Sequence, residues 1–290
     1  MLVITGSESF LGGKLISSLK SKNQKFIGID ISENSQEYDF VKMDIRSVEL
    51  EKIIPKNSTI IHLAALSSDP ICRENPHQAF DINVMGTLNL IKTAIKVNAQ
   101  QLIFASTEWV YGDFEGTEEK TEDTPIDITK FVSEYALSKI VSEMNLKQQY
   151  KKGLDNITIL RFGIIYGPRE RNWSAFESIV HSVKHSDSVS IGSLKTGRRF
   201  IHIDDIISGI ELSVGKKGFE IINLSGDKII TLKDIICAAE QYYKKSIKIL
   251  EKDSNNISIR NPSNEKAKKN LEWTPKINLI EGLKSIDPFV

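Results

Sequence analysis

A tyrosine and a lysine stand four residues apart in the segment Tyr135-Ala136-Leu137-Ser138-Lys139. Positions i and i+4 of a helix share one face, so the phenol and the ammonium would lie side by side. A cation beside a phenol favours the phenolate and lowers the pKa of the tyrosine toward the range of a general base. The spacing therefore predicts a proton-transfer pair, although Tyr-x-x-x-Lys by itself more often marks a surface pair.

A second candidate site lies near the N-terminus, where the apolar run Leu2–Thr5 leads through a glycine-containing segment into a helical pattern. A strand that turns tightly into a helix points backbone N–H groups and the positive helix end at a pyrophosphate. Gly6 would permit the turn and Gly12 the close packing of helix on sheet, whereas Ser9 replaces the usual middle glycine. The alternative is that the segment is only a tight turn.

An acid ends the next predicted strand, Phe26–Ile29. Asp30 at that position would accept hydrogen bonds from the adenosine ribose hydroxyls and repel a 2′-phosphate. Residues 31–34 contain no Lys or Arg to hold NADP. NAD is therefore the predicted cofactor, and the alternative interpretation of Asp30 is an ordinary loop acid.

Elements that would position these residues alternate along the first half of the chain, as short β-branched runs and helical patterns. Such alternation is typical of a doubly wound parallel sheet, so we predict the α/β class, with a six-stranded Rossmann sheet. The predicted strands are Leu2–Thr5, Phe26–Ile29, Phe40–Met43, Thr59–Leu63, Gln101–Ala105 and Ile157–Arg161, and the helices are Phe10–Lys22, Val48–Ile53, Pro76–Val97 and Phe131–Lys151.

A smaller C-terminal lobe is predicted after Pro168, where shorter elements follow. The predicted domains are an NAD-binding domain over residues 1–165 and a substrate-binding lobe over 166–290, with a segment near 198–214 returning to the first. The second-half elements are helices near 175–184, 206–214, 232–243, 265–270 and 279–284, and strands near 189–191 and 200–203.

Composition excludes several classes of function. The 290 residues carry 38 Lys and Arg against 38 Asp and Glu, which predicts no nucleic-acid or membrane-surface partner. Cys72 and Cys237 form no CxxC pair that would suggest disulfides or a zinc knuckle. No cleavable leader and no apolar run near the roughly 20 residues of a membrane span are found, so we expect a cytoplasmic protein.

Histidines suggest metal binding at one place only. Glu177, His181 and His185 lie at i, i+4 and i+8 of a predicted helix, a spacing that could hold zinc. No further ligand is evident and serines stand among them, so we interpret this as a solvated helix face and predict no metal site. We interpret His62 and His202 as structural rather than as proton carriers.

Many motifs occur in a fixed order over nearly the whole chain. They are Thr5-Gly6 with Gly12, Asp30, Asp44-Ile45, His62–Ala65, Asn83–Thr87, Ser106-Thr107, Val110–Gly112, Tyr135 with Lys139, Arg161, Tyr166–Arg169, Gly197–Asp205, Lys266-Ala267, Leu271–Pro275 and Glu281–Leu283. With these motifs the sequence resembles the extended short-chain dehydrogenase/reductases, specifically the NAD-dependent nucleotide-sugar epimerase/dehydratase family and its UDP-glucose 4-epimerase-like members.

The resemblance implies roles for individual residues. Thr107 would hydrogen-bond the reacting sugar hydroxyl, Tyr135 would remove its proton as hydride leaves for the nicotinamide, and Lys139 would bind the nicotinamide ribose. Arg198 and, by a looser match, Arg260 would bind the substrate diphosphate through guanidinium forks. The implied cofactor-binding set is Gly6, Ser9, Phe10, Leu11, Gly12, Asp30, Asp44, Ile45, Leu63, Ala64, Ala65, Asn83, Ser106, Tyr135, Lys139, Phe162 and Gly163.

The expected reaction is C4 epimerisation of a nucleotide sugar through a transient 4-keto intermediate. A 4,6-dehydratase, a 4-ketoreductase and a non-catalytic NAD or nucleotide sensor are the alternatives. Related dehydratases have Thr-Asp-Glu before Val-Tyr-Gly, whereas this chain has Thr107-Glu108-Trp109, and Trp109 cannot transfer protons. Glu108 would be either a catalytic, substrate-contacting acid or a rim residue. Ile164 replaces an asparagine that touches substrate in many relatives. The family also implies a homodimer through helices 76–97 and 131–151.

Overall fold

The structure, a computed structural model, describes residues 1–33, 38–114, 116–131 and 133–290. The chain forms two compact units. Unit 1 consists of Met1–Gly112, Pro125–Arg161 and Ile210–Ile222, and unit 2 of Asp113–Thr124, Phe162–Gly209 and Asn223–Val290. The division into an NAD-binding domain and a substrate-binding lobe stays a prediction. No helix in the described ranges is long and apolar enough to span a membrane.

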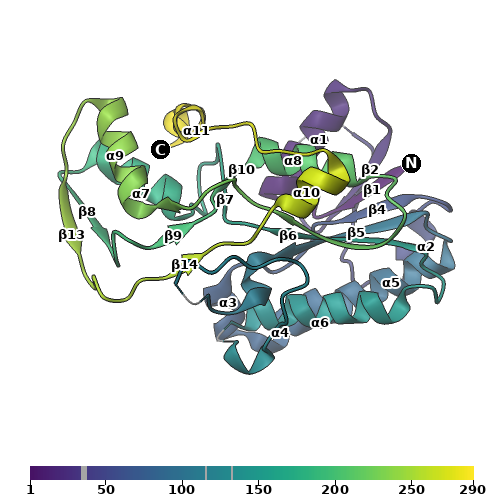
Figure 1. Ribbon diagram of the computed structural model, residues 1–290. Coiled ribbons are helices and arrows are strands. Elements are labelled where there is room, and N and C mark those ends of the chain that lie inside the picture. The colour runs from purple at the N-terminus through teal and green to yellow at the C-terminus, as the bar shows by residue number, and fades with distance from the viewer. Residues whose placement is uncertain (34–37, 115, 132) are drawn as a thin grey trace. The chain divides into compact units, whose positions relative to one another are not determined.

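A sheet with the order β11-β6-β5-β4-β1-β2-β3 organises unit 1 (Figure 1). Its strands are β1 Leu2–Thr5, β2 Phe26–Asp30, β3 Phe40–Lys42, β4 Thr59–His62, β5 Gln101–Thr107, β6 Asn156–Phe162 and β11 Gly218–Leu224. The pairs joining β1 to β2 and β4, β2 to β3, and β4 to β5 are parallel. The doubly wound α/β prediction is confirmed, but the prediction of six strands is wrong, because seven described strands form this sheet.

Helices cover both faces of this sheet. Helix α1, Phe10–Ser21, lies on one face, and α5, Gly86–Lys96, and α6, Glu134–Gln149, lie on the other (Figure 1). In α5 the buried side chains of Leu90, Ile91 and Ala94 follow helical spacing and pack against the β-branched strand residues. The core of unit 1 is therefore the layer between the sheet and these helices.

Two long predicted helices have different boundaries in the structure. The stretch predicted over 76–97 comprises α4 Pro76–Phe80, a π-helical segment η1 Asp81–Met85, and α5. The helix predicted from Phe131 begins at Glu134, because the Ser133 side chain accepts a hydrogen bond from the Ala136 amide, 3.1 Å away, and caps the N-terminus. Residue 132 lies outside the described residues. Helix α2, Leu50–Ile53, is shorter than predicted, and α3, Asp69–Glu74, was not predicted.

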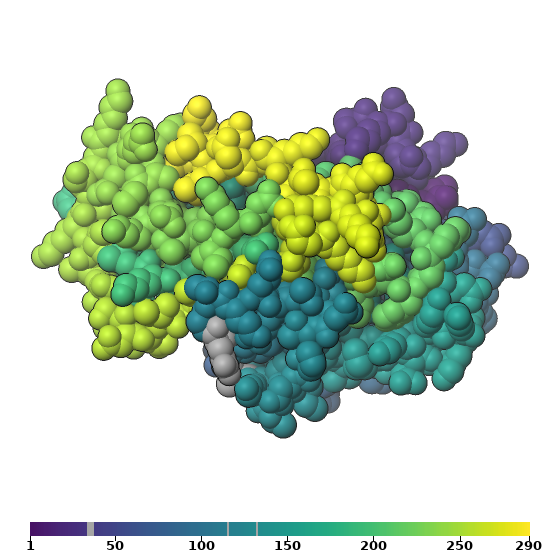
Figure 2. All heavy atoms as spheres, viewed as in Figure 1, coloured from purple at the N-terminus to yellow at the C-terminus, as the bar shows by residue number. Residues whose placement is uncertain are grey.

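Unit 2 has its own core, in which α7 and α9 pack together through Phe176, Ile179, Ile235 and Ile236. Its helices are α7 Ala175–His185, α9 Leu232–Tyr243, α10 Glu265–Leu271 and α11 Leu279–Ile286. The residues of α8, Ile203–Ser213, belong to unit 2 up to Gly209 and to unit 1 from Ile210. Its short strands are β7 Ile165–Tyr166, β8 Ser188–Ile191, β9 Gly197–Arg198, β10 Ile201–His202, β12 Ile230–Thr231, β13 Lys248–Glu251 and β14 Ile259–Arg260. The predicted surface helix near 265–270 is found as α10, shown in yellow in Figure 2.

Candidate active site

The turn from β1 into α1 is as tight as the sequence predicts. Gly6 has a φ of +73°, and a Cβ there would lie 2.6 Å from the Ala64 amide nitrogen. A Cβ on Gly12 would lie 2.1 Å from the Gly6 carbonyl oxygen. Glycine is required at both positions, since an added carbon would displace backbone. The turn brings the first residues of α1, Phe10 and Leu11, to the positive helix end where a pyrophosphate can bind.

Ser9, which replaces the usual middle glycine, is the N-cap of α1. Its hydroxyl accepts from the Gly12 amide at 3.0 Å and donates to the Gly6 carbonyl at 2.7 Å. The serine thus ties the two glycines of the turn together. The serine that replaces the usual glycine therefore keeps the turn closed and also caps the N-terminus of α1.

Asp30 is the last residue of β2 and is held by backbone. Its carboxylate accepts from the Glu8 amide at 3.0 Å and from the Ser32 amide at 2.9 Å. A carboxylate has about four acceptor sites, so ribose hydroxyls can still bind it. Sequence analysis missed Tyr38, whose hydroxyl hydrogen-bonds the Glu8 carboxylate and lies 2.9 Å from Ser7 Oγ. Burial, followed by the bond to Glu8, raises the pKa of Tyr38.

Asp44 and Ile45, two members of the predicted cofactor-binding set, follow β3. Asp44 hydrogen-bonds Arg46 through its carboxylate, and this bond lowers the pKa of Asp44. Ile45 is buried, and its carbonyl accepts from Asn89 Nδ2 at 2.8 Å. A Cβ on Gly86 would lie 2.6 Å from Ile45 Cδ1, so α5 packs closely against this loop.

The segment after β4, containing Leu63, Ala64 and Ala65, is held by Asn83 from the π-helical segment. Asn83 Oδ1 accepts from the Leu66 amide at 2.7 Å, and Asn83 Nδ2 donates to the Leu66 carbonyl and to Ser138 Oγ, both at 2.9 Å. Both ends of the Asn83 amide therefore bond to protein atoms and tie this segment to α6. π-Helical turns are frequent at functional sites.

His62, the last residue of β4, is completely buried between two threonines. Its Nδ1 lies 2.7 Å from Thr5 Oγ1 and its Nε2 lies 3.0 Å from Thr87 Oγ1. Burial lowers the pKa of His62 to about 3. The imidazole is neutral at pH 7, in agreement with its interpretation as structural.

Tyr135 and Lys139 share one face of α6, and this face lies against the end of β5. Lys139 Nζ donates to the Ala105 carbonyl at 2.8 Å and lies 5.8 Å from the Tyr135 ring centroid. Thr107 ends β5, and its Oγ1 accepts from the Trp109 amide at 3.3 Å. One unit thus supplies all three groups of the predicted proton-transfer set.

The expected effect of Lys139 on the Tyr135 phenol is not found. Burial raises the pKa of Tyr135, and the neighbouring Cys72 adds to the rise. Burial also lowers the pKa of Lys139 to about 8, against the opposing effects of Glu143 and Cys72. Desolvation outweighs the attraction that the i, i+4 spacing suggested.

Glu108 and Ser106 are both buried. Glu108 begins the 3-10 helix η2, Glu108–Tyr111, and is completely inaccessible, so its interpretation as a rim residue is wrong. Ser106 Oγ donates to Glu143 Oε1 at 2.5 Å. The Ser106 side chain therefore faces a carboxylate on α6.

The predicted residues of unit 2 lie on its short strands. Arg198 and Arg260 are register partners on the parallel pair β9 and β14, a proximity that the sequence did not predict. Arg198 donates to the Ser258 carbonyl at 2.6 Å, and the Arg260 guanidinium lies 5.9 Å from the Phe114 ring centroid. Two arginines in register on paired strands supply guanidinium groups of the kind that bind a diphosphate.

The strand end after β6 explains the departure at Ile164. The buried Phe162 leads into Gly163, whose amide donates to the Leu224 carbonyl at 2.9 Å, and a Cβ there would lie 2.9 Å from the Arg199 carbonyl oxygen. Ile164 packs against the apolar core of unit 2. An asparagine at that position would place a polar amide against these apolar groups.

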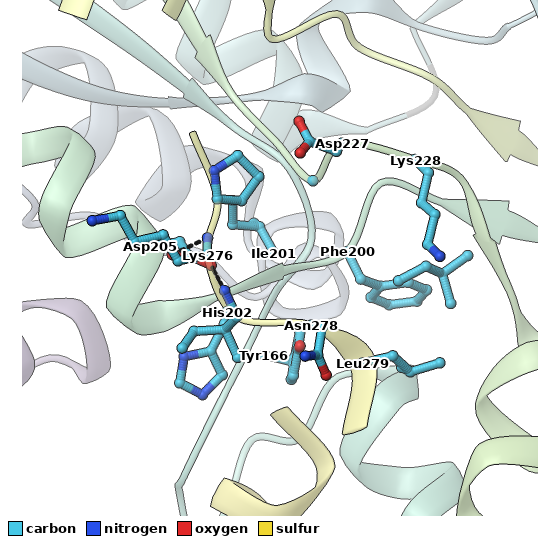
Figure 3. A pocket seen from close by; sticks show the side chains of 14 residues that line it. Tyr166, Phe200, Ile201, His202, Asp205, Asp227, Lys228, Lys276, Asn278 and Leu279 are labelled. Atoms are coloured by element: carbon cyan, nitrogen blue, oxygen red, sulfur yellow. Dashed lines mark hydrogen bonds between the residues drawn. The ribbon is translucent and has the colours of Figure 1, made fainter. Parts of the chain in front are cut away.

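A cavity of about 330 Å³ in unit 2 was not predicted (Figure 3). It is lined by Tyr166, Phe200, Ile201, His202, Asp205, Gly226, Asp227, Lys228, Ile230, Pro275, Lys276, Ile277, Asn278 and Leu279. Asp205 accepts from the Lys276 amide at 2.8 Å, and His202 Nδ1 from the Asp204 amide at 3.2 Å. The residues predicted to bind NAD or substrate, all of them described, are not among its lining. The buried polar groups of this cavity hold the C-terminal segment in place.

Helix α7 contains Glu177, His181 and His185, the residues whose spacing could hold zinc. The described residues contain no cluster of three His, Cys, Asp or Glu side chains that could hold a metal. Glu177 is completely buried and accepts from Arg169 Nε at 2.8 Å and from the Gly167 amide at 3.1 Å. The interpretation of Glu177 as part of a solvated face is therefore wrong, because its carboxylate is the partner of a buried ion pair.

Comparison with known proteins gives a consistent result. The family described as "NAD dependent epimerase/dehydratase family" matches residues 2–225. A UDP-glucuronate 4-epimerase of Thermodesulfobacterium geofontis is 30% identical, over 97% of this chain and 93% of its own length. UDP-glucuronic acid decarboxylase 1 of Arabidopsis thaliana is 26% identical, over 97% of this chain and 68% of its own length.

Solved structures have the same fold. A UDP-glucuronic acid 4-epimerase from Bacillus cereus, in a complex containing NAD, superposes with a TM-score of 0.87 at 24% identity and covers 99% of this chain and 98% of its own. A UDP-glucose 4-epimerase from Thermus thermophilus, in complex with NAD, gives a TM-score of 0.86 at 22% identity over 99% and 98% of the two chains.

Proposed function

This chain belongs to the NAD-dependent epimerase/dehydratase family, and from that premise we propose that it is a UDP-sugar 4-epimerase whose first candidate substrate is UDP-glucuronate. NAD is its cofactor, and the glycine turn, which an added Cβ would fill, fits that cofactor. The substrate is proposed from the relative that is 30% identical over nearly the whole of both chains.

One observation carries the reaction type. The bond from Lys139 Nζ to the Ala105 carbonyl holds the Tyr135 face of α6 against the end of β5, where Thr107 lies. In the proposed mechanism Thr107 orients the C4 hydroxyl by a hydrogen bond, and Tyr135 Oη, as the phenolate, takes the proton of that hydroxyl and later returns it to the same oxygen, while the hydride would return to the opposite face of C4. NAD, when bound, supplies the hydride acceptor and donor. Lys139 would bind the nicotinamide ribose.

We assign the binding of NAD and the binding of the sugar nucleotide to separate groups of residues. Asp30 would accept the adenosine ribose hydroxyls of NAD, and the α1 N-terminus with Ser9, Phe10 and Leu11 would face its pyrophosphate. Arg198 and Arg260, which are adjacent on β9 and β14, would bind the sugar-nucleotide diphosphate.

Decarboxylation is the second candidate reaction, because several relatives are UDP-glucuronic acid decarboxylases. Oxidation at C4 of a glucuronate makes a ketone β to the carboxylate, which can lose carbon dioxide. Both reactions share the first step, so the product decides between them. A 4,6-dehydratase is disfavoured because Trp109 stands where a second proton-transfer group would be needed.

The test is to incubate the purified protein with UDP-glucuronate and analyse products by NMR and mass spectrometry. We expect a C4 epimer of unchanged mass and no net accumulation of NADH. A pentose product would establish the decarboxylase instead, and no turnover of UDP-glucuronate, UDP-glucose or UDP-N-acetylglucosamine would contradict the proposal.

We also propose a homodimer that pairs helices 76–97 and 131–151, and a cytoplasmic location. Met85 and Met144, on η1 and α6, are exposed by 55% and 41%, which supports contact with a second copy. Cys72 and Cys237 are free thiols, as is usual in a reducing compartment.

A further inference from the structure

A third ionisable residue continues the line of Tyr135 and Lys139 along α6. Glu143 follows Lys139 by four residues, so Tyr135, Lys139 and Glu143 lie at i, i+4 and i+8 on one helix face. Lys139 is 3% exposed and Glu143 is completely buried. The proposed mechanism does not use Glu143, although its burial as a carboxylate demands compensation.

Side chains on two neighbouring strands compensate the buried charge of Glu143. Arg161 on β6 donates to Glu143 from Nε at 3.1 Å and from Nη2 at 2.6 Å, a two-point contact between a guanidinium and a carboxylate. Ser106 on β5 donates to the same carboxylate at 2.5 Å. Ser106 directly precedes Thr107, so the ion pair fixes α6 against the strand end that carries the proposed substrate contact.

Several titratable groups face Lys139 from the surrounding elements. Glu143 and Tyr135 belong to its own helix, Cys72 comes from α3, and His62 from β4. His62 and Cys72 are neutral at pH 7, because burial lowers the pKa of the imidazole and raises that of the thiol. Tyr135 is a protonated phenol, because burial raises its pKa. The negative charge that faces the buried ammonium therefore belongs to Glu143.

We propose that Glu143 is a positioning residue that keeps Lys139 protonated and directed at the end of β5, and that Arg161 holds the Glu143 carboxylate in place for this purpose. The assignment of Lys139 to the nicotinamide ribose rests on the proposed function. The electrostatic coupling between Glu143 and Lys139 does not.

The pH dependence follows from the sign of each effect. Burial lowers the pKa of Lys139 to about 8, and the Glu143 carboxylate opposes that lowering. Loss of the carboxylate would leave the Arg161 guanidinium as an unbalanced positive charge in the same buried region. Lys139 would then lose its proton at a lower pH than in the unchanged protein.

The test measures the pKa of Lys139 directly in the full chain. Lysines are labelled with ¹³C at Cε and titrated by NMR, and the resonance missing from Lys139→Arg identifies Lys139. In Glu143→Gln we expect the pKa of Lys139 to fall by at least about one unit, the lower end of the effect of one nearby charge. A smaller fall overturns the proposal.

Glu177→Gln is the matched control. Glu177 is also completely buried and also paired with an arginine, Arg169, but it lies on α7 of unit 2. This variant should lose stability as Glu143→Gln does and leave the pKa of Lys139 unchanged. An equal fall in both variants would show a general loosening of structure and would also overturn the proposal.

The double variant E143Q/R161Q covers the case in which E143Q does not fold, because it removes both charges of the Glu143–Arg161 pair and leaves no uncompensated guanidinium. It should also lower the pKa of Lys139, and an unchanged value there overturns the proposal. The titration needs no substrate, so absence of UDP-sugar turnover would contradict the proposed function alone. If the enzyme is active, the alkaline fall of kcat in E143Q should shift to lower pH while KM for the sugar stays the same.

Discussion

Proton transfer at the proposed site depends on one phenolic oxygen. Burial raises the pKa of Tyr135, so the phenol must give up its own proton before its oxygen can accept the proton of the C4 hydroxyl. Thr107 is 7% exposed and is the last residue of β5, so its hydroxyl is held at the end of a buried strand. In the proposed mechanism Tyr135 therefore exchanges a proton, whereas Thr107 only orients the substrate.

Removal of that oxygen should abolish turnover and leave cofactor binding intact. In Tyr135→Phe we expect kcat to fall by about 10²–10⁴-fold, the usual contribution of general acid–base catalysis. NAD affinity, measured by calorimetry, should stay the same, since the ring is retained. Retention of more than about a tenth of kcat would show that another group carries the proton.

Asp30 should set the preference for NAD over NADP. The carboxylate is anchored by the Glu8 and Ser32 amides, so a 2′-phosphate would meet a fixed negative charge. We expect calorimetric titration to show that NAD binds more tightly than NADP. In Asp30→Asn the difference between the two affinities should become smaller. Asp39→Asn removes the same charge from an exposed position and should change neither affinity. Equal or tighter NADP binding by the unchanged protein would contradict the assignment.

At the scale of elements, sequence periodicity predicted most of what unit 1 contains. Strands such as β1, β4 and β6 were found to within two residues, because buried β-branched runs have no competing structure. The seventh strand, β11, was missed because its place beside β6 depends on contacts between segments far apart in sequence. The π-helical segment η1 was missed because its apolar spacing resembles that of an α-helix.

Residues of the candidate site could be predicted from the sequence where they belong to a motif. They could not be predicted where only packing in the folded chain gives them their contacts. The glycine turn, Asp30 and the Tyr135–Lys139 pair were recognisable from type and spacing. Glu143 was not singled out, because a glutamate on a helix usually faces solvent. Tyr38, Ser106 and Arg161 acquire their contacts only when distant segments meet, so no local pattern reveals them.

The N-cap of α1 gives an element-scale prediction. Ser9→Ala removes the hydroxyl that accepts from the Gly12 amide, so the free energy of unfolding should fall by about 0.5–2 kcal/mol. Ser9→Gly restores the family pattern and should cost only about a few tenths of a kcal/mol. Urea titration measures both. Ser17→Ala, at an exposed serine of the same helix, is the control, and an equal loss in all three variants would refute the cap.

At the scale of the whole molecule, the exposed Met85 and Met144 lead to a prediction about the oligomeric state. If η1 and α6 pair with a second copy, Met85→Lys with Met144→Lys would place charges in an apolar contact. Light scattering of the unchanged protein at micromolar concentration should give twice the mass of one chain, and the double variant should give the monomer mass. A monomer mass for the unchanged protein counts decisively against the dimer.

The order of strands in the main sheet has a consequence for biosynthesis. Strand β11, Gly218–Leu224, lies at the edge of the sheet beside β6, which ends at Phe162. A nascent chain therefore exposes one side of β6, with unpaired amides and carbonyls, until the ribosome has passed residue 224. Open strand edges invite pairing with other chains. The nucleotide-binding turn at residue 6 thus leaves the ribosome well before residue 224, after which the sheet that supports this turn can close.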